Sequence, residues 1–362
     1  MVKLSRRTAL RTAGVVTGFG LGGCLQFGPE GTDCEKGRTI HDHDVDLSAD
    51  AEWGHLHYSA ANTGYNPDAV GPDSLEEPAW RYANCRPSEL GMLFHSPGVL
   101  QFGPHQNDAR TGERIEDSSD DWEMKARFRG ARVVGGTTYK TAGRQVIARD
   151  GDDERWRTAP EDEGAFLLGV ADGSVFVGAS AKDSEWTYAL DADTGDQQWR
   201  TEVEPDGIAA IANGRVYLGV EDSVLLALDA ATGEERWRQD LEVFRIELPV
   251  AVTDDAVYAA GTGGRVASLT TDGERRWSVE TDVDTLVSPT VAADTVYTGG
   301  GFTPRSNSLV ALDADDGTTR NIFGTRLYDT GEVGHAGLTT GPVAVEGVLY
   351  VPTRAGDIYA FD

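Results

Sequence analysis

A short sequence motif recurs about every forty residues along this chain and narrows the folds that the chain can adopt. The fullest copies are YALDADTGDQQW at residues 188–199 and LALDAATGEERW at residues 226–237. Weaker copies lie at residues 107–115, 146–156, 267–277 and 310–320. The turn glycines of the six copies are spaced by 39, 44, 38, 40 and 44 residues: Gly112, Gly151, Gly195, Gly233, Gly273 and Gly317. A strand–turn–strand unit at this period is typical of a β-propeller, in which each unit builds one blade.

Each unit divides into four predicted strands. In residues 208–237, short apolar runs flank the Asn213-Gly214 pair, and Asn-Gly between such runs is a strong signal for a hairpin turn. Four of the six units end in a tryptophan, at Trp156, Trp199, Trp237 and Trp277. We interpret these side chains as large apolar surfaces that pack between neighbouring blades.

The two ends of the repeat region complete each other. A seventh unit, residues 341–362, stops before its turn and outer strand, whereas residues 78–82 carry a terminal-type Trp80 with no repeat before it. We therefore expect the N-terminal segment to close the ring and protect the sheet edges. The prediction is an all-β, seven-bladed β-propeller of four-stranded blades over residues 51–362.

The first residues are typical of an export signal. Arg6 and Arg7 precede a short apolar stretch that ends at Cys24, and the arginine pair resembles a twin-arginine signal. We expect residues 1–23 to be removed and Cys24 to carry a lipid that anchors the protein to the outer face of the cytoplasmic membrane. The alternative is an ordinary cleaved signal with an incidental cysteine.

Residues 24–50 lack periodicity and are interpreted as a flexible acidic tether. The run His41-Asp42-His43-Asp44 within it has residue types that can bind a metal, but a solvated polar linker is the favoured interpretation.

The charge of the chain is strongly negative. Asp and Glu total 60 against 32 Lys and Arg, which gives −28, and the acidic residues are spread along the whole chain. An even distribution indicates a surface adapted to a very salty environment, as in halophilic archaea, because salt screens the mutual repulsion. Binding to nucleic acid is disfavoured, since phosphate contacts need clustered Lys and Arg.

The phrase Ala-x-Asp-x-x-Thr-Gly followed by Trp, at residues 189–199 and 227–237, resembles the tryptophan-docking repeat of the pyrroloquinoline-quinone-type propellers. Residues 53–72, with Asn62-Thr63-Gly64-Tyr65-Asn66, resemble the opening segment of the same proteins. The resemblance covers residues 52–362 and implies the propeller fold. It leaves function open, because the superfamily holds quinoprotein dehydrogenases and also non-catalytic propellers, such as a lipoprotein of the bacterial outer-membrane assembly machine.

What the resemblance implies for a dehydrogenase does not fit this sequence well. The resemblance implies eight blades, a metal-bound quinone and, often, two adjacent cysteines for a dehydrogenase of this kind. In this sequence we count seven units, and no two cysteines are adjacent. No nucleophile elbow, zinc-binding helix motif or phosphate loop is found either. We therefore predict no cofactor, with pyrroloquinoline quinone and calcium as the alternative.

The favoured function is a non-catalytic, extracytoplasmic lipoprotein that acts as a scaffold or assembly factor for a protein partner, as a monomer. The alternative is a quinoprotein-like dehydrogenase or a propeller that binds a small ligand. Cys34 and Cys85 remain after lipidation and are either a disulfide or two free thiols.

Connections of variable length point to the partner-binding face. The first and third turns of each unit are short, whereas the other end of the blades carries longer connections at residues 181–187, 302–308 and 328–337. Trp186 stands outside the tryptophan position of the repeat. The residues of this predicted face are Trp122, Trp186, Phe302, Arg305, Tyr328 and His335. The alternative is a set of ordinary loops, with Trp186 packing locally.

Overall fold

The computed structural model divides the chain into residues 1–33 and 34–362, and every residue that it describes belongs to the second part. The described residues are 38–48, 53–55, 58–72, 74–83, 93–102, 105–115, 131–182, 184–221, 223–242, 246, 249–284, 286–300, 307–325 and 337–362. Every regular element in these ranges is a β-strand.

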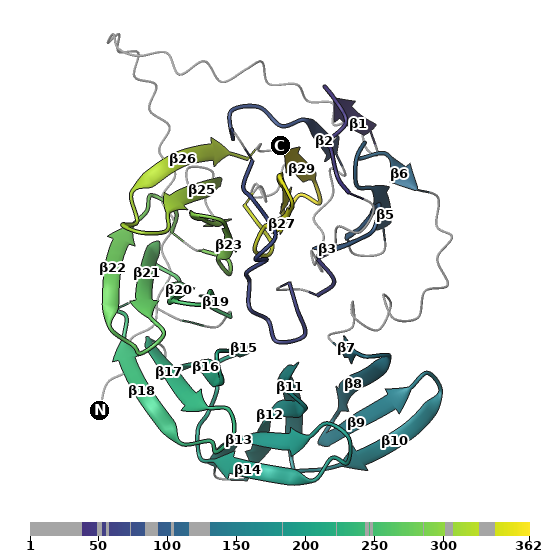
Figure 1. Ribbon diagram of the computed structural model, residues 1–362, viewed down its shortest axis with the longest axis vertical. Coiled ribbons are helices and arrows are strands. Elements are labelled where there is room, and N and C mark those ends of the chain that lie inside the picture. Colours follow the sequence, from purple (N-terminus) through teal and green to yellow (C-terminus); the bar gives the residue numbers. More distant parts are fainter. Residues whose placement is uncertain are drawn as a thin grey trace, which may run out of the picture. The chain divides into compact units, whose positions relative to one another are not determined.

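The strands form seven antiparallel sheets, which we number as blades 1 to 7 in chain order (Figure 1). Blades 1 to 3 contain β3 (Leu93–Ser96), β4 (Val99–Phe102), β5 (His105–Asp108), β6 (Arg114–Ile115); β7 (Arg132–Val134), β8 (Thr137–Ala142), β9 (Gln145–Asp150), β10 (Asp153–Thr158); and β11 (Gly164–Ala171), β12 (Ser174–Ala181), β13 (Ser184–Asp191), β14 (Gln197–Thr201). Blades 4 and 5 contain β15 (Ala210–Ala212), β16 (Arg215–Val220), β17 (Val224–Asp229), β18 (Glu235–Asp240); and β19 (Ala251–Val252), β20 (Ala256–Ala260), β21 (Arg265–Thr270), β22 (Arg275–Glu280). Blade 6 contains β23 (Thr290–Ala292), β24 (Thr295–Gly300), β25 (Ser308–Asp313) and β26 (Thr319–Gly324).

Blade 7 joins the two ends of the described chain. Its strand order is β1 (Arg38–His41), β2 (Trp80–Ala83), β29 (Ile358–Phe361), β28 (Val348–Pro352) and β27 (Val343–Val345). The closing pair is antiparallel, with Trp80 opposite Ala360 and Tyr82 opposite Ile358. The predicted all-β propeller, closed by an N-terminal strand, is therefore the fold.

Five tryptophans lie at the boundaries between blades. A Cβ atom added to the turn glycine of the following blade would meet each indole at 2.4–2.7 Å; the five pairs are Trp80 with Gly112, Trp156 with Gly195, Trp199 with Gly233, Trp237 with Gly273, and Trp277 with Gly317. Four of the indoles also donate a hydrogen bond across the boundary, at 2.9–3.0 Å, to the carbonyl oxygens of Ala192, Ala230, Thr271 and Ala314. Glycine is required in these turns because the indole leaves no space for a side chain.

Backbone hydrogen bonds define two ends of the blades. The third turn bonds the first turn of the same blade, as from the Ala192 N–H to the Gly173 oxygen at 2.9 Å; we call this end the turn face. The second loops bond the links between blades, as from the Thr281 N–H to the Gly264 oxygen at 2.8 Å; we call this end the loop face.

Two expectations about irregular segments are wrong. Residues 181–187 were expected to be an inserted loop, but β12 runs to Ala181 and β13 starts at Ser184, so that the insertion lengthens two strands. Residues 38–48 were assigned to the flexible tether, but 38–41 form β1 because they pair with β2, and Val45 is fully buried.

Residues 53–70 follow the innermost strands of the blades in chain order. Their main-chain bonds join Trp53 to His95 of blade 1, Ala60 to Val170 of blade 3, Ala61 to Ile211 of blade 4, Thr63 to Val252 of blade 5, Gly64 to Val291 of blade 6 and Val70 to Glu346 of blade 7. In blade 2, the Val133 N–H points to the His55 ring at 3.4 Å. These contacts lie near the ends of the inner strands that lead into the first turns, so the segment lies inside the ring of blades at the turn face (Figure 1).

Candidate functional site

Blade 3 differs from the other blades by the length of its strands. Each of β11, β12 and β13 has 8 residues, whereas the inner strands of blades 4, 5 and 6 have 3, 2 and 3. The pairing of β13 with the outer strand β14 ends at Thr187 opposite Thr201, so residues 184–186 of β13 extend beyond β14 at the loop face.

Trp186 lies on this extension. It is two residues from Tyr188 and therefore on the same face of β13, where it packs against the hydrophobic cluster between blades 2 and 3. Its Nε1 atom donates a hydrogen bond to the Ser184 Oγ atom at 2.9 Å. The Arg200 guanidinium lies over the indole ring, 4.5 Å from the centroid, at a distance that permits a cation–π interaction.

A second set of contacts joins the same arginine to the link between blades 2 and 3. The Tyr188 hydroxyl donates a hydrogen bond to the Glu161 carboxylate, and Arg200 Nη1 lies 3.5 Å from Glu161 Oε1. Burial, followed by the hydrogen bond to Glu161, raises the pKa of Tyr188 above its ordinary value. The Arg200 side chain is 49% exposed. An indole, a guanidinium and a carboxylate are thus held together at the loop face; we call Glu161, Trp186, Tyr188 and Arg200 the blade 3 patch.

The blade 3 patch is suited to binding. Trp186 and Arg200 supply its accessible surface, whereas Tyr188 is only 1% exposed and holds Glu161 in place. Trp and Arg are among the residue types that most often dominate the energy of protein–protein interfaces, because they bury large areas and also form directed polar contacts. Within the described ranges, no group of three or more His, Cys, Asp or Glu side chains is placed to hold a metal ion.

The structure describes one residue of the predicted partner-binding face. Trp186 is on a strand of blade 3, whereas Trp122, Phe302, Arg305, Tyr328 and His335 lie outside the described residues. In chain order, Trp122 falls between blades 1 and 2, Phe302 and Arg305 between β24 and β25, and Tyr328 and His335 between blades 6 and 7.

Sequence reasoning missed the partners of Trp186. Arg200 directly follows the repeat tryptophan Trp199, so it looks like an ordinary position of the repeat. The available signal was the apolar run at residues 175–179 and the alternation of polar and apolar side chains at residues 185–188, which favour two extended strands.

The export signal, Cys24 and the two other cysteines, Cys34 and Cys85, also lie outside the described residues. The described ranges contain no helix of the length and hydropathy that a membrane span requires.

The sheets, their closure and the tryptophans between blades define a β-propeller of the tryptophan-docking type. A family model described as outer membrane protein assembly factor BamB matches residues 106–206 and 183–362. Because these residues make up more than half of the chain, the protein belongs to this family of propellers with pyrroloquinoline-quinone-type repeats.

The solved structures to which the chain is similar are distant in sequence. BamB from Moraxella catarrhalis is 18% identical, covering 75% of this chain and 78% of its own, with a TM-score of 0.48. The computationally designed protein Ika8 is 13% identical, covering 82% and 99%, with a TM-score of 0.57. Quinohemoprotein alcohol dehydrogenase from Comamonas testosteroni is 15% identical, covering 86% and 80%, with a TM-score of 0.48. No curated protein sequence matches the chain.

Proposed function

We propose that the protein is a non-catalytic scaffold or assembly factor, anchored outside the cytoplasmic membrane through Cys24, which binds a protein partner with the loop face of blade 3. The observation that carries this proposal is the stacking of Arg200 on Trp186, with the guanidinium centre 4.5 Å from the ring centroid. Membership of the BamB family, whose described role is outer membrane protein assembly, supports binding to proteins at a membrane.

The position of residues 53–70 also supports a protein partner over a small molecule at the centre of the ring. The main chain of this segment bonds inner-strand groups of five blades and the first turn of blade 7, and Asn62, which is fully buried, bonds three more groups near these strands. At the turn face, residues 53–70 already form hydrogen bonds with these groups. A quinone bound at the centre of the ring would therefore have to share this end of the ring with the segment.

The test is photo-cross-linking of the full chain in its own cells, in molar salt, with the cross-linker placed at Lys182 on the exposed loop face of blade 3. Arg200→Gln removes the guanidinium over Trp186 and should lower the yield of the main cross-linked product about tenfold, as expected for a hot-spot residue. The matched control is Arg238→Gln, because Arg238 follows Trp237 in blade 4 as Arg200 follows Trp199 in blade 3. Equal yields from both variants would contradict the proposed site.

Replacing Trp186 and Phe302 together tests the predicted face in the same cells. The double substitution to Ala should abolish capture of the partner by the tagged protein without lowering its thermal stability. An unchanged set of captured proteins would contradict a role for this face.

A further inference from the structure

The closure of blade 7 lacks a covalent turn. In blades 3 to 6, a turn joins the third strand to the fourth, whereas β29 and β2 of blade 7 come from opposite ends of the described chain. The pair is held by its ladder and by a buried ion pair between Arg81 Nη2 and Asp357 Oδ2 at 2.7 Å. Strand β2 would be an exposed edge if nothing covered its outer side.

Strand β1 covers that outer side. It pairs with β2 along its whole length, from Arg38 opposite Ala83 to His41 opposite Trp80. As a result, β2 lies between two strands, and Trp80 and Tyr82 are each only 1% exposed.

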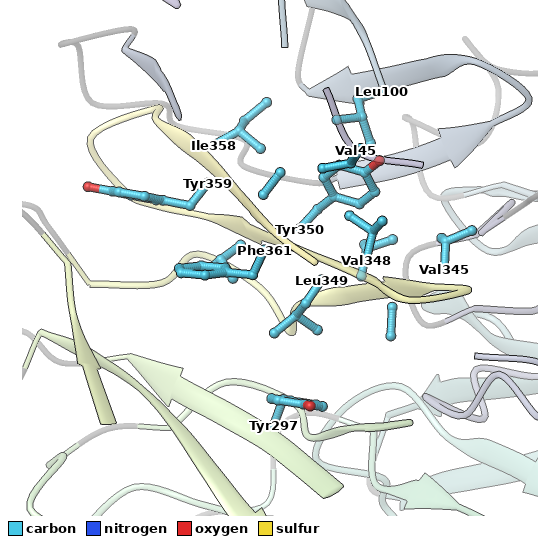
Figure 2. Packing of buried hydrophobic residues seen from close by; sticks show 14 of the residues in the cluster. Val45, Leu100, Tyr297, Val345, Val348, Leu349, Tyr350, Ile358, Tyr359 and Phe361 are labelled. Atoms are coloured by element: carbon cyan, nitrogen blue, oxygen red, sulfur yellow. The ribbon is translucent and has the colours of Figure 1, made fainter. Parts of the chain in front are cut away.

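The same segment also holds the third turn of blade 1. Thr39 Oγ1 donates a hydrogen bond to the Gly112 oxygen at 3.0 Å, and the Val45 N–H donates one to the Arg110 oxygen at 3.1 Å. The fully buried Val45 side chain belongs to the cluster that contains Leu100 of blade 1 and Tyr350 of blade 7 (Figure 2).

The hydrogen bond from Thr39 to the turn of blade 1 takes the place of a bond that, in blade 3, comes from the outer strand of the blade itself. In blade 3, Thr201, two residues after Trp199, donates to the Gly233 oxygen of blade 4 at 2.7 Å. The corresponding position after Trp80 is Tyr82, and Tyr82 is the ladder partner of Thr39. Strand β1 therefore supplies the contact that the closing strand lacks.

Two polar contacts hold the end of the segment on blade 7. His43 Nε2 lies 3.0 Å from Asp362 Oδ1, and the Ser48 N–H donates to Glu346 Oε2 at 2.7 Å. The other ring nitrogen of His43, Nδ1, lies 3.0 Å from Asp42 Oδ2. Because a neutral imidazole has one N–H, only the protonated ring donates to both carboxylates.

We propose that residues 38–48 form a clasp that locks blade 7 to blade 1 across the open seam, and that protonation of His43 controls how firmly the clasp is held. This inference concerns closure of the ring and is independent of the proposed partner. The charged groups that face the His43 ring are Asp42 on the clasp and Asp362 at the end of blade 7.

The direction of the pH effect follows from these contacts. Hydrogen bonds to Asp42, and then to Asp362, raise the pKa of His43 above its ordinary value of 6.5. A raised pKa in the folded state means that the contact stabilises the clasp fully below about pH 6.5 and that this stabilisation is lost as the pH rises through the higher folded value.

Hydrogen–deuterium exchange of the full chain tests the clasp. Val45→Ala should make the amides of β1, β2 and β29 exchange about tenfold faster, while blades 3 to 5 stay unchanged. Ile40→Ala is the control, because Ile40 lies on the same clasp but is 53% exposed. Unchanged exchange in β2 and β29, or an equal increase in every blade, would overturn the clasp.

The pH dependence of hydrogen–deuterium exchange tests the role of His43. After correction for the intrinsic exchange rate, the protection of β1 and β2 in the unmodified chain should be constant below about pH 6.5 and fall between about pH 6.5 and pH 8, and His43→Gln should remove this dependence. His41→Gln is the control, since His41 bonds Asp44 within the clasp, at 2.7 Å. A pH dependence that persists in His43→Gln would overturn the protonation control.

Discussion

Trp199 of blade 3 donates the hydrogen of its Nε1 atom to the carbonyl oxygen of Ala230 in blade 4, at 2.9 Å. The indole also lies against Gly233 in the same turn, where an added Cβ atom would come within 2.5 Å of the ring. Each such turn therefore receives the tryptophan of the preceding blade, and the contact fixes the spacing of the blades.

The first prediction concerns this contact. Gly233→Ala should lower the free energy of unfolding by about 3 kcal/mol, because the new methyl group clashes with the indole in addition to straining a backbone with φ of 73°. Denaturant unfolding in molar salt measures the change.

The matched control is Gly151→Ala. Gly151 has a similar φ of 57°, but a Cβ there would meet nothing within 4 Å. It should cost only about 1 kcal/mol, the strain of the left-handed conformation alone. Equal losses in the two variants would show that the indole contact does not determine the stability of the turn.

The repeat made most of the propeller predictable from sequence. The turn sequence Asp-x-x-Thr-Gly is local: Asp191 Oδ1, for example, accepts hydrogen bonds from the Asp193 and Thr194 N–H groups at 3.0 and 2.9 Å. Interactions over so few residues leave a readable signal in the sequence. The closing strand was predictable as well, because an outer strand was missing at one end and a spare strand was present at the other.

The clasp and residues 53–70, which we call the inner segment, were not predictable in this way. Strand β1 has four residues, and its partners in β2 lie about forty residues further along, so pairing and not local pattern determines it. Asn62 looks like an ordinary turn residue in sequence, yet its contacts are with Arg132, Leu168 and Ala209. Such long-range contacts carry no local signal.

The second prediction concerns Asn62. Its Nδ2 atom donates to the oxygens of Leu168 and Ala209 at 2.7 and 2.8 Å, and its Oδ1 atom accepts from Arg132 Nη2 at 2.9 Å. These groups belong to blades 2 and 3 and to the start of blade 4. Asn62→Ala should lower the free energy of unfolding by about 3 kcal/mol, because polar groups in a buried site lose their hydrogen-bond partners.

Asn213→Ala is the comparison for that variant. Asn213 has a similar φ, 53° against 56° for Asn62, but makes one hydrogen bond at the surface, to the Thr253 oxygen at 2.9 Å. We expect a loss of about 1 kcal/mol, measured by the same denaturant unfolding. If the two substitutions lower the free energy of unfolding equally, the contacts of Asn62 do not stabilise the packing of the blades.

The third prediction is a pH dependence at Asp229 in the third turn of blade 4. The hydrogen bond from Arg236 is the main cause that lowers the pKa of Asp229 to about 2, with bonds from Thr232 and Ala231 adding to it. Because the folded pKa lies below the ordinary value of 3.8, the ionised group stabilises the fold above about pH 4, and this is lost as the pH falls toward 2.

Arg236→Gln should move the pKa of Asp229 upward, which a carboxyl-carbon NMR titration of this residue measures. Arg238→Gln is the control, since Arg238 pairs with Glu235, at 2.9 Å, and not with Asp229. A titration midpoint that does not move in Arg236→Gln would contradict the assigned cause.

The fourth prediction is a disulfide between Cys34 and Cys85, two residues outside the described ranges. In the antiparallel ladder, Arg38 is opposite Ala83, so the first residue of β1 and the last residue of β2 lie at the same end of the ladder. Cys34 is four residues before Arg38 and Cys85 two residues after Ala83. In an oxidising compartment, a thiol–disulfide oxidant would take up the two electrons and two protons released as the S–S bond forms.

Peptide mapping without reductant should find the two cysteines linked, and the denatured, oxidised protein should show no free thiol from either. The link closes a loop of about 50 residues and should stabilise the fold by about 4 kcal/mol through the unfolded chain. A reductant should therefore lower the unfolding midpoint of the unmodified protein but not that of Cys34→Ser. Two free thiols in the protein isolated from its own cells would instead support the unpaired alternative, in which the clasp is held only by the contacts of residues 38–48.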